Sequence, residues 1–568
     1  MENKKHIAIL GGGPSGLFMF KRLVNTGNTD ISITIFERKN KLGAGMPYSD
    51  EGASDEHITN VSGNEIPVLV TSLNDWVKTI SKDTLDKYHM DASRFNEYKV
   101  LPRLLFGQYL TAQFDLLQKK AREKGIAYTV CYNTTVTDII DQPEKGVVIV
   151  ETDDSKQTEF DHVIICTGHN WPRKHEGRVA NYFESPYPPV KLALELNHTV
   201  AIKGSSLTAV DAIRTLARHN GTFDKNKAGR LLYTPYSERP DFKMVMHTRN
   251  GMLPAVRFHL EDSHLSNDSL LSKEEIKAHI KDNNGFLSLD YIFERDFKLP
   301  IQVKEPEFYD KIKDMQLEQF VDAMMALREE LDPFQLLKAE YAEAEQSIKR
   351  KKSVYWKEML GVLSFALNYP AKHLSAEDMQ RLQQSLTPLI SIVIAYIPQS
   401  SSEELLALHQ AGVLELIPVG DESRVEPHED GGAMYLYTDE AENEQSIHYQ
   451  TYVDCVGQPH LSFEDLPFKS LIDGRVVTPA RLKFSSAEEG LRALNSGKPV
   501  SKDDRGDYYL KVSGITINDH FQVVDAYGAY NERIYMMAVP YIGGYNPDYS
   551  GLDFSEKASG IIIERLMA

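Results

Sequence analysis

The chain has little cysteine: three residues in a length of 568. Cys131, Cys166 and Cys455 lie far apart, and no two of them form a Cys-x-x-Cys pair. This spacing excludes a disulfide framework, a cysteine-rich zinc site and a dithiol redox centre. We therefore expect a reducing, cytoplasmic setting and assign no metal ligands.

Long apolar runs are also missing. The longest, LISIVIAYI at residues 389–397, is far shorter than the roughly 20 residues that a membrane-spanning helix needs. An earlier apolar stretch, IAIL at residues 7–10, ends at Gly11, before it reaches the length of an export signal. We expect neither a membrane span nor a signal peptide.

Positive charge is in deficit, with 63 Lys and Arg against 82 Asp and Glu and a net charge of −19. This balance argues against binding to nucleic acid or to anionic membrane surfaces. The length exceeds what a single hydrophobic core holds, so two to four domains are expected. A small-molecule substrate is the expected partner, and a homo-oligomer is left open.

Glycine is concentrated in a motif near the start of the sequence. Residues 6–23 read HIAILGGGPSGLFMFKRL, a buried strand followed by glycines and then a helical pattern. Gly11, Gly13 and Gly16 give the spacing G-x-G-x-x-G. In such a motif the glycines allow a tight turn, let a diphosphate approach the backbone and let the helix pack against the strand. The helix N-terminus offers free N–H groups and the positive end of its dipole.

A carboxylate at the expected distance strengthens this prediction. Residues 31–39, ISITIFERK, form a second predicted strand that contains Glu37, 21 residues after Gly16. An acid at this spacing accepts hydrogen bonds from the ribose hydroxyls of a dinucleotide. The alternative is a plain glycine turn followed by a surface glutamate.

We call such a strand, glycine turn and helix N-terminus a cradle; the first is at residues 6–23. A second, altered cradle is predicted at residues 198–217, HTVAIKGSSLTAVDAIRTLA. Gly204 opens the turn, but Ser206 stands where a second glycine is expected, and its Cβ narrows the approach of a diphosphate. The next strand, within residues 243–251, is followed by Arg249, whose guanidinium suits the 2′-phosphate of NADP. The alternatives are a turn that has lost its nucleotide and a solvated arginine.

Together these motifs resemble the FAD-NAD(P)-binding protein family, two-dinucleotide-binding flavoproteins related to flavin-containing and N-hydroxylating monooxygenases. The matching segments, in the family's order, are ILGGGPSGL, ERKNKLGAGMPYS, LPRLLFGQYL, ICTGHNWP, SPYPP, GSSLTAVDAIRTL, TRNGMLP and VDCVGQPH. The resemblance implies an α/β fold with two Rossmann-like domains, for FAD and NAD(P), and the helix-forming composition of residues 256–388 predicts a helical insertion in the second. It departs from the family at Ser206 and in RIYMMAVP, residues 533–540, which lacks the usual Gly-Asp.

The resemblance also implies which residues bind the cofactors, FAD and NADP, with NAD as an alternative. The first cradle would hold the ADP part of FAD, the segment after it would approach the flavin, and the second cradle would hold NADP. Gly551, Leu552 and Asp553 are predicted to lie beside the isoalloxazine at the start of a helix near Phe554; the alternative is an ordinary helix capped by Asp553. The candidate cofactor-binding residues are Gly11, Gly13, Pro14, Ser15, Gly16, Glu37, Arg38, Gly45, Met46, Asn60, Arg103, Val136, Thr167, Gly168, Gly204, Ser205, Ser206, Thr208, Arg249, Gly551, Leu552 and Asp553.

The order of motifs predicts that the second domain is inserted into the first. The run at residues 389–397 is predicted as the delayed third strand of the NAD(P) domain, after a helix-forming stretch rich in Glu, Lys and Leu. That stretch is either a wall over the flavin or a structural or subunit-contact element. The predicted boundaries are 1–196 and 446–568 for the FAD domain, 197–255 and 389–445 for the NAD(P) domain, and 256–388 for the helical insertion.

We expect an FAD-dependent, NAD(P)H-using oxidoreductase, foremost a monooxygenase that acts on a small molecule through a flavin hydroperoxide. One alternative is an NAD(P)H-dependent reductase of a quinone, a metal or a protein. Another is a non-catalytic flavin-binding sensor or scaffold, which the altered second cradle favours. No catalytic acid or base is assigned; His169, beside Gly168, also suits a turn-capping role.

Overall fold

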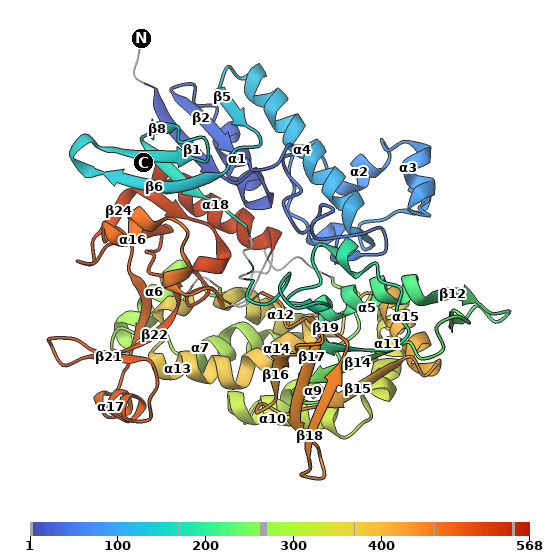
Figure 1. Ribbon diagram of the computed structural model, residues 1–568. Helices are drawn as coiled ribbons and strands as arrows, with labels where there is room; N and C mark the ends of the chain where they lie inside the picture. Colours follow the sequence, from blue (N-terminus) through green and yellow to red (C-terminus); the bar gives the residue numbers. More distant parts are fainter. Residues whose placement is uncertain are drawn as a thin grey trace.

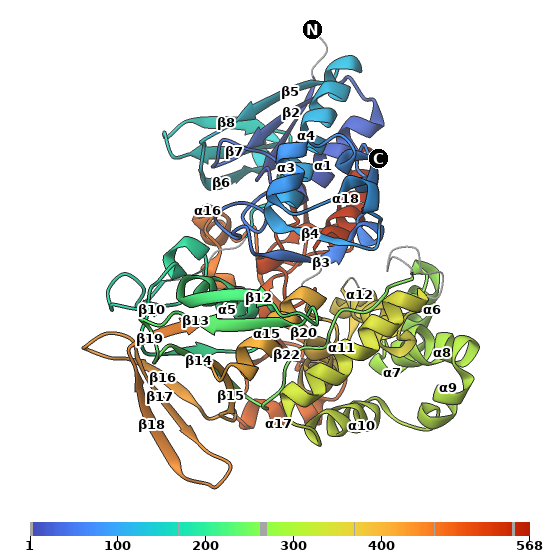
Figure 2. The same cartoon turned by 90° about the vertical axis from the view of Figure 1, so that its right-hand side faces the viewer.

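The fold is given by a computed structural model. It describes residues 4–168, 171, 173–261, 270–368, 370–458, 460–547 and 551–568. The N-terminal sheet and its helices lie at one end of the molecule, with the second sheet and a group of helices side by side at the other end (Figures 1 and 2). The arrangement confirms the α/β class with two dinucleotide-type sheets, one parallel and one parallel except for its edge strand.

The first sheet has six strands in the order β23-β24-β9-β1-β2-β5. The central strand β1 lies parallel to β2 on one side and to β9 on the other, and its apolar residues are fully buried. Helix α1 follows β1 directly and packs against α4 and α18. The bounds are β1 Lys5–Leu10, α1 Pro14–Thr26, β2 Ile31–Phe36, α4 Arg103–Glu123, β5 Ala127–Cys131, β9 His162–Ile165, β23 Gln522–Val524, β24 Tyr530–Met536 and α18 Leu552–Leu566.

The second sheet has five parallel strands in the order β10-β19-β11-β14-β15. Helix α5 follows β11 just as α1 follows β1, and α15 lies beside α5. A three-stranded antiparallel sheet, β16-β17-β18, projects from this domain (Figure 1). The bounds are β10 Tyr182–Phe183, β11 Thr199–Lys203, α5 Leu207–Asn220, β12 Gly221–Lys225, β13 Leu231–Pro235, β14 Lys243–Thr248, α15 Gln399–Gln410, β15 Leu414–Pro418, β16 Arg424–Pro427, β17 Ala433–Thr438, β18 Glu444–Tyr449 and β19 Thr451–Asp454.

Two of the predicted domain boundaries differ from the strand pairing. Strand β19 lies beyond the predicted boundary at 445/446 but pairs with β11 in the second sheet. Strand β10 lies before the boundary at 196/197 and pairs with β19. All the strands of the second sheet therefore lie between residues 182 and 454. The second domain begins earlier and ends later than predicted.

The predicted strand at residues 389–397 is wrong. The structure places most of this run in helix α14 (Thr387–Val393), and Ile397 forms only an isolated bridge with Val256. The position beside β14 that this strand would have taken is occupied by β15. A short apolar run suits a buried strand or a buried helix equally well, so the pattern alone could not decide between them.

The helical insertion is present, but it does not pack mainly on the second sheet. Most of its buried residues belong to one hydrophobic core with the first sheet and the C-terminal strands, while α11 packs against α15 of the second domain. The insertion thus bridges the two domains. Its helices are α6 Lys273–Asp282, α7 Leu289–Ile292, α8 Leu299–Lys304, α9 Pro306–Ile312, α10 Leu317–Glu329, α11 Pro333–Arg350, α12 Tyr355–Leu367, α13 Ala376–Arg381 and α14.

Smaller elements complete the first domain. A short pair of strands, β3 and β4, precedes α4, and a three-stranded antiparallel sheet, β6-β7-β8, packs against the first sheet. Another antiparallel sheet, in the order β20-β22-β21, belongs to the C-terminal part. The bounds are β3 Ile58–Ser62, α2 Leu73–Val77, α3 Lys82–Lys87, β4 Val100–Pro102, β6 Val136–Gln142, β7 Val147–Thr152, β8 Gln157–Phe160, α16 Lys469–Asp473, β20 Pro479–Lys483, α17 Ala487–Asn495, β21 Val500–Lys502 and β22 Tyr508–Ile515.

Candidate functional site

The turn between β1 and α1 can be built only with glycine at two of its positions. Gly11 has φ +107°, and a Cβ there would lie 2.7 Å from the carbonyl oxygen of Cys166. A Cβ on Gly16 would lie 2.1 Å from the carbonyl oxygen of Gly11. The first of these glycines gives the tight turn and the second lets the helix pack against the strand, which are the roles predicted from their spacing.

Gly13 has a different environment. It caps the N-terminus of α1, and Pro14 occupies the first turn. A Cβ on Gly13 would have only the backbone of Gly45 within 4 Å, the nearest atom at 3.3 Å. Gly13 and Gly45 (φ +59°) therefore face each other across the start of the helix, and Met46 follows in the same loop. The helix N-terminus beside them is where a diphosphate would bind.

Glu37 lies at the end of β2 beside this turn, and the protein backbone holds its carboxylate in place. Oε2 accepts a hydrogen bond from the N–H of Gly12 at 2.8 Å, and Oε1 accepts one from the N–H of Lys39 at 2.9 Å. Each carboxylate oxygen retains a lone pair that can accept a ribose hydroxyl. The neighbouring Arg38 instead forms an exposed ion pair with Glu51. The ribose contact of Glu37 stays a prediction.

The N-terminus of α18 lies next to that of α1. The two helices meet through the hydroxyls of Ser15 and Ser555, whose oxygens are 3.2 Å apart. The N-cap of α18 is Gly551, so the alternative in which Asp553 caps this helix is wrong; Leu552 and Asp553 lie in its first turn. Two positive helix ends therefore converge at one place, which favours an anionic or electron-rich ligand there.

A buried hydroxyl beside the first turn is independent evidence on whether a ligand fits there. Thr167 follows β9, and its backbone N–H would be 3.3 Å from a Cβ on Gly11. Its Oγ1 is buried and has no hydrogen-bond partner among the described residues. Leaving such a group unpaired costs about 1–3 kcal/mol, which a ligand in the cradle would recover. The glycine turn, the Glu37 carboxylate as an acceptor and this hydroxyl together fit a dinucleotide.

Three other predicted contacts have less support. The carbonyl oxygen of Asn60 accepts a hydrogen bond from Arg257. Val136 is the first residue of β6, and Gly168 is exposed, with open space where a Cβ would lie. Cofactor contact stays a prediction for all three. His169, the candidate for a turn-capping role, lies outside the described residues.

The second turn reproduces the first in part. Gly204 has φ +102°, and a Cβ there would lie 3.1 Å from the carbonyl oxygen of Cys455, the counterpart of Cys166. Ser205 Oγ donates to the carbonyl of Met252 at 2.7 Å, and Ser206 is the N-cap of α5. Thr208 lies in the first turn of α5. The turn thus keeps the Rossmann path, while the Ser206 side chain occupies the N-cap position where a diphosphate would approach.

Arg249 lies just after β14, at the position predicted for a 2′-phosphate contact. Its side chain is 75% exposed, and Nη1 lies 3.7 Å from Oδ1 of the equally exposed Asp421. Exposed pairs of this kind are worth at most about 1 kcal/mol, so the guanidinium is available to a phosphate. The 2′-phosphate role stays a prediction.

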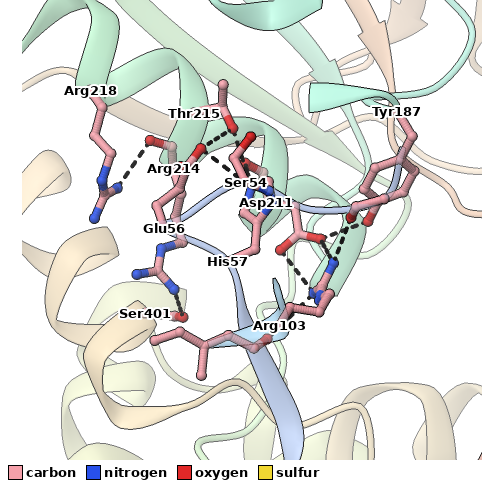
Figure 3. Close-up of polar contacts among 12 residues, drawn as sticks. Ser54, Glu56, His57, Arg103, Tyr187, Asp211, Arg214, Thr215, Arg218 and Ser401 are labelled. Atoms are coloured by element: carbon pink, nitrogen blue, oxygen red, sulfur yellow. Dashed lines mark hydrogen bonds and ion pairs between the residues drawn. The ribbon is translucent and has the colours of Figure 1, made fainter. Parts of the chain in front are cut away.

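Arg103 has a different partner from the cofactor that the sequence suggested. Its guanidinium forms two hydrogen bonds with the carboxylate of Asp211 on α5, in the second domain (Figure 3). The predicted cofactor contact therefore needs correction: the charge of Arg103 is neutralised by a protein carboxylate. Nothing in the local sequence around either residue indicates this pairing, which joins segments 108 positions apart.

His247, at the end of β14, gives a prediction about pH. Burial lowers its pKa from 6.5 to about 4, and its ring stacks on Tyr435 with ring centres 4.0 Å apart. Because the folded-state pKa is depressed, the neutral form stabilises the fold above pH 6.5, and this stability is lost as the pH falls towards 4.

In the wild type, protonation of this histidine should lower the free energy of unfolding by about 2 kcal/mol between pH 7 and pH 5. His247→Phe keeps the stacked ring and should remove that part of the loss, as urea unfolding at both pH values would measure. An equal loss in both proteins would contradict the assignment.

A cavity of about 430 Å³ lies between the insertion and the C-terminal part. Its charged groups include Lys372, His373 and Asp519. The Asp519 carboxylate lies 2.6 Å from Lys372 Nζ and 3.1 Å from His373 Nε2, and the bond to His373 holds its pKa well below the usual range. These groups neutralise one another, which favours no ligand of either charge.

Within the described part of the chain, no helix is long and apolar enough to cross a bilayer. The same residues contain no group of three or more His, Cys, Asp or Glu side chains placed to hold a metal ion.

Comparison with known proteins agrees with this geometry. Residues 8–170 match the family model described as FAD-NAD(P)-binding, and residues 272–394 match the YdhS-like middle domain. The chain is 28% identical over 476 residues to the Escherichia coli (strain K12) protein named "Uncharacterized protein YdhS", covering 82% of this chain and 86% of that protein. The trimethylamine monooxygenase of Roseovarius sp. (strain 217) is 26% identical, over 29% of this chain and 36% of the enzyme.

Among solved structures, the FAD-bound cadaverine monooxygenase DfoA of Erwinia amylovora aligns with a TM-score of 0.48 and 12% identity. The alignment covers 99% of this chain and 94% of that one. The chain thus spans about a third of the length of the trimethylamine enzyme but nearly all of DfoA. The segment similar to the FAD-NAD(P)-binding family, residues 8–170, contains the first glycine turn, Glu37 and Thr167.

Proposed function

We propose that this protein is an FAD-dependent, NADPH-using monooxygenase of a small molecule. The observation that carries the proposal is the pair of glycine turns, at Gly11 and Gly204, each of which joins a central parallel strand to a helix N-terminus. Two such turns in one chain suit the transfer of hydride from one dinucleotide to another. Sequence similarity to flavin-containing monooxygenases supports oxygen as the final acceptor.

The residues of the first domain would bind and orient FAD. The N-terminus of α1 would hold the diphosphate beside Gly13, and Glu37 would accept hydrogen bonds from the ribose. The N-terminus of α18, which begins at Gly551, would place a positive dipole at the flavin ring and stabilise its reduced, negatively charged form. Bound FAD would supply the redox chemistry and the reaction with oxygen.

A reductase that passes electrons to a quinone, a metal or a protein is the second candidate. The chain has no Cys-x-x-Cys pair for disulfide reduction. A non-catalytic flavin-binding sensor is the third candidate, and Ser206 at the N-cap of α5 is the observation that favours it.

The experiment is to load the purified protein with FAD and follow NADPH absorbance in air, with a panel of small amines, sulfides and ketones. NADPH loss that one compound stimulates, with an oxygenated product, supports the monooxygenase. Loss that needs an added electron acceptor supports the reductase. Flavin that stays oxidised under excess NADPH and NADH contradicts both enzymatic candidates.

Arg249 is predicted to select NADPH over NADH. Replacing Arg249 with alanine should raise the KM for NADPH about tenfold and leave that for NADH unchanged, because a charged hydrogen bond to the 2′-phosphate is lost. Steady-state kinetics with both coenzymes make the measurement. Arg424, another exposed arginine of the second domain, supplies the matched control, Arg424→Ala. Equal effects on the two coenzymes would remove Arg249 from this role.

A further inference from the structure

Three residues of the sequence motifs have no role in the proposed cradles, yet the fold brings them together. Arg103 comes from LPRLLFGQYL, Tyr187 from SPYPP and Asp211 from the middle of GSSLTAVDAIRTL. Arg103 begins α4 of the first domain, and Asp211 is on α5, the helix of the second cradle. Figure 3 shows the three side chains meeting at the Asp211 carboxylate.

The carboxylate of Asp211 is surrounded by donors from both sides. Arg103 donates from Nη1 to Oδ2 at 2.6 Å and from Nη2 to Oδ1 at 3.2 Å, and the Tyr187 hydroxyl donates to Oδ2 at 2.6 Å. Asp211 is 5% exposed. Burial acts to raise its pKa, but the interactions with Arg103, Tyr187 and neighbouring groups together outweigh burial and hold the pKa below its ordinary value. The pair is therefore charged in the folded protein, and a two-pronged contact of this kind fixes orientation as well as distance.

A second set of contacts binds the next turn of the same helix. Thr215, four residues after Asp211, donates from Oγ1 to Glu56 Oε1 at 2.6 Å. The N–H of Ser54 donates to His57 Nδ1 at 2.9 Å, which leaves the proton on Nε2 to donate to the carbonyl of Asp211 at 3.2 Å. His57 is 1% exposed, and burial lowers its pKa, so the ring is neutral.

Both ends of this contact are rigidly held. In the first domain, the Arg103 guanidinium also donates to the carbonyls of Gly52 and Ile58, at 3.2 and 3.4 Å, and so closes the loop that carries Glu56 and His57. In the second domain, Arg214 on α5 donates to Ser401 and Glu404 of α15. Helix α5 is thus fixed to its own domain through one set of residues and to the first domain through another.

We propose that Arg103, Tyr187 and Asp211, with Glu56, His57 and Thr215, form an interdomain lock that holds the second cradle in one orientation to the first. Rotating α5 away would break the two-pronged ion pair between Arg103 and Asp211 and the hydrogen bond from Tyr187. The catalytic consequence rests on the proposed function: hydride transfer needs the reacting atoms about 3–3.5 Å apart. Arg103 and Asp211 are positioning residues, and the two domains stay in this arrangement throughout turnover.

The test compares wild type with Asp211→Asn and with the double variant Arg103→Met, Asp211→Asn. Spin labels on cysteines introduced at Lys119 of α4 and Lys225 of β12, both exposed, report the distance between the domains in a Cys131→Ser background. We expect one narrow distance distribution in wild type and a broadened or bimodal one in the double variant. Flavin reduction at saturating NADPH should fall at least tenfold in the double variant, while FAD content and reduction by dithionite stay unchanged.

Arg381→Met is the matched control, because Arg381 pairs with several carboxylates inside the insertion alone. Arg103→Lys keeps the charge without the two-pronged geometry and should give an intermediate rate, which also covers the case in which the double variant fails to fold. A narrow distance distribution and an unchanged reduction rate in the folded variants would overturn the lock. If wild type is not reduced by NADPH at all, the proposed function fails, and the distance measurement alone decides the lock.

Discussion

Gly13→Val is expected to give a folded but colourless protein, with FAD affinity lowered at least 100-fold. The turn can accept the added Cβ with a small shift: apart from the chain neighbours, the nearest described atom would be Gly45 Cα at 3.3 Å, which has to move by a few tenths of an ångström. The valine methyl groups would instead stand at the N-terminus of α1, where the diphosphate has to approach the backbone. Gly11 and Gly16 serve this test less well, because a Cβ at either position would clash with backbone atoms and threaten the fold itself.

FAD content after purification and a fluorescence titration of apoprotein with FAD measure this effect. Gly560→Val is the matched control: it lies on α18, and outside the helix backbone the nearest atoms to an added Cβ are those of the Arg22 guanidinium, 3.3 Å away or more. The control should retain its flavin, and both variants should unfold in urea close to wild type. A Gly13→Val protein that binds FAD like wild type would contradict the position of the diphosphate.

Arg257→Ala is expected to lower the free energy of unfolding by about 3–5 kcal/mol. Arg257 is buried and forms a cluster with Glu65, Ser62 Oγ (2.7 Å from Nη2) and the carbonyl of Asn60, and Tyr396 donates to the same glutamate at 3.3 Å. Removing the guanidinium leaves a buried carboxylate without its counter-ion, which costs more than the contact itself contributes.

Urea unfolding at pH 7 makes the measurement. Tyr396→Phe removes one neutral donor from the same carboxylate and should cost only about 1 kcal/mol. Arg381→Ala, a more exposed arginine, should cost about 1 kcal/mol or less. Similar losses of unfolding free energy in all three variants would contradict the prediction that the buried Arg257 cluster stabilises the fold more than an exposed ion pair does.

The parts of the fold that the sequence predicted correctly depend on neighbouring residues. The first turn could be read from the spacing of Gly11, Gly13 and Gly16, because the strand-to-helix turn itself sets that spacing: Gly11 takes a positive φ, and Gly16 packs against the carbonyl oxygen of Gly11. The placement of Glu37 followed from the length of one strand–helix–strand unit. The structure confirms these positions, although the cofactor contacts themselves stay predictions.

The parts that were missed depend on contacts between distant segments. Whether residues 389–397 form a strand was decided by β15, which occupies the place beside β14. The partner of Arg103 is an aspartate on a helix of the other domain, and an arginine in a motif looks the same whether it binds a phosphate or a carboxylate. A single sequence contains no signal for either outcome.

The sheet order also dictates when the FAD site is complete during synthesis. Strand β24 pairs with β9, and α18 packs against α1. The first sheet and its helix layer therefore combine early and late segments of the sequence. During synthesis, the first sheet stays incomplete until β23 and β24 have emerged, after all the strands of the second sheet. The second domain, whose strands all lie between residues 182 and 454, can therefore complete its sheet before the first domain does.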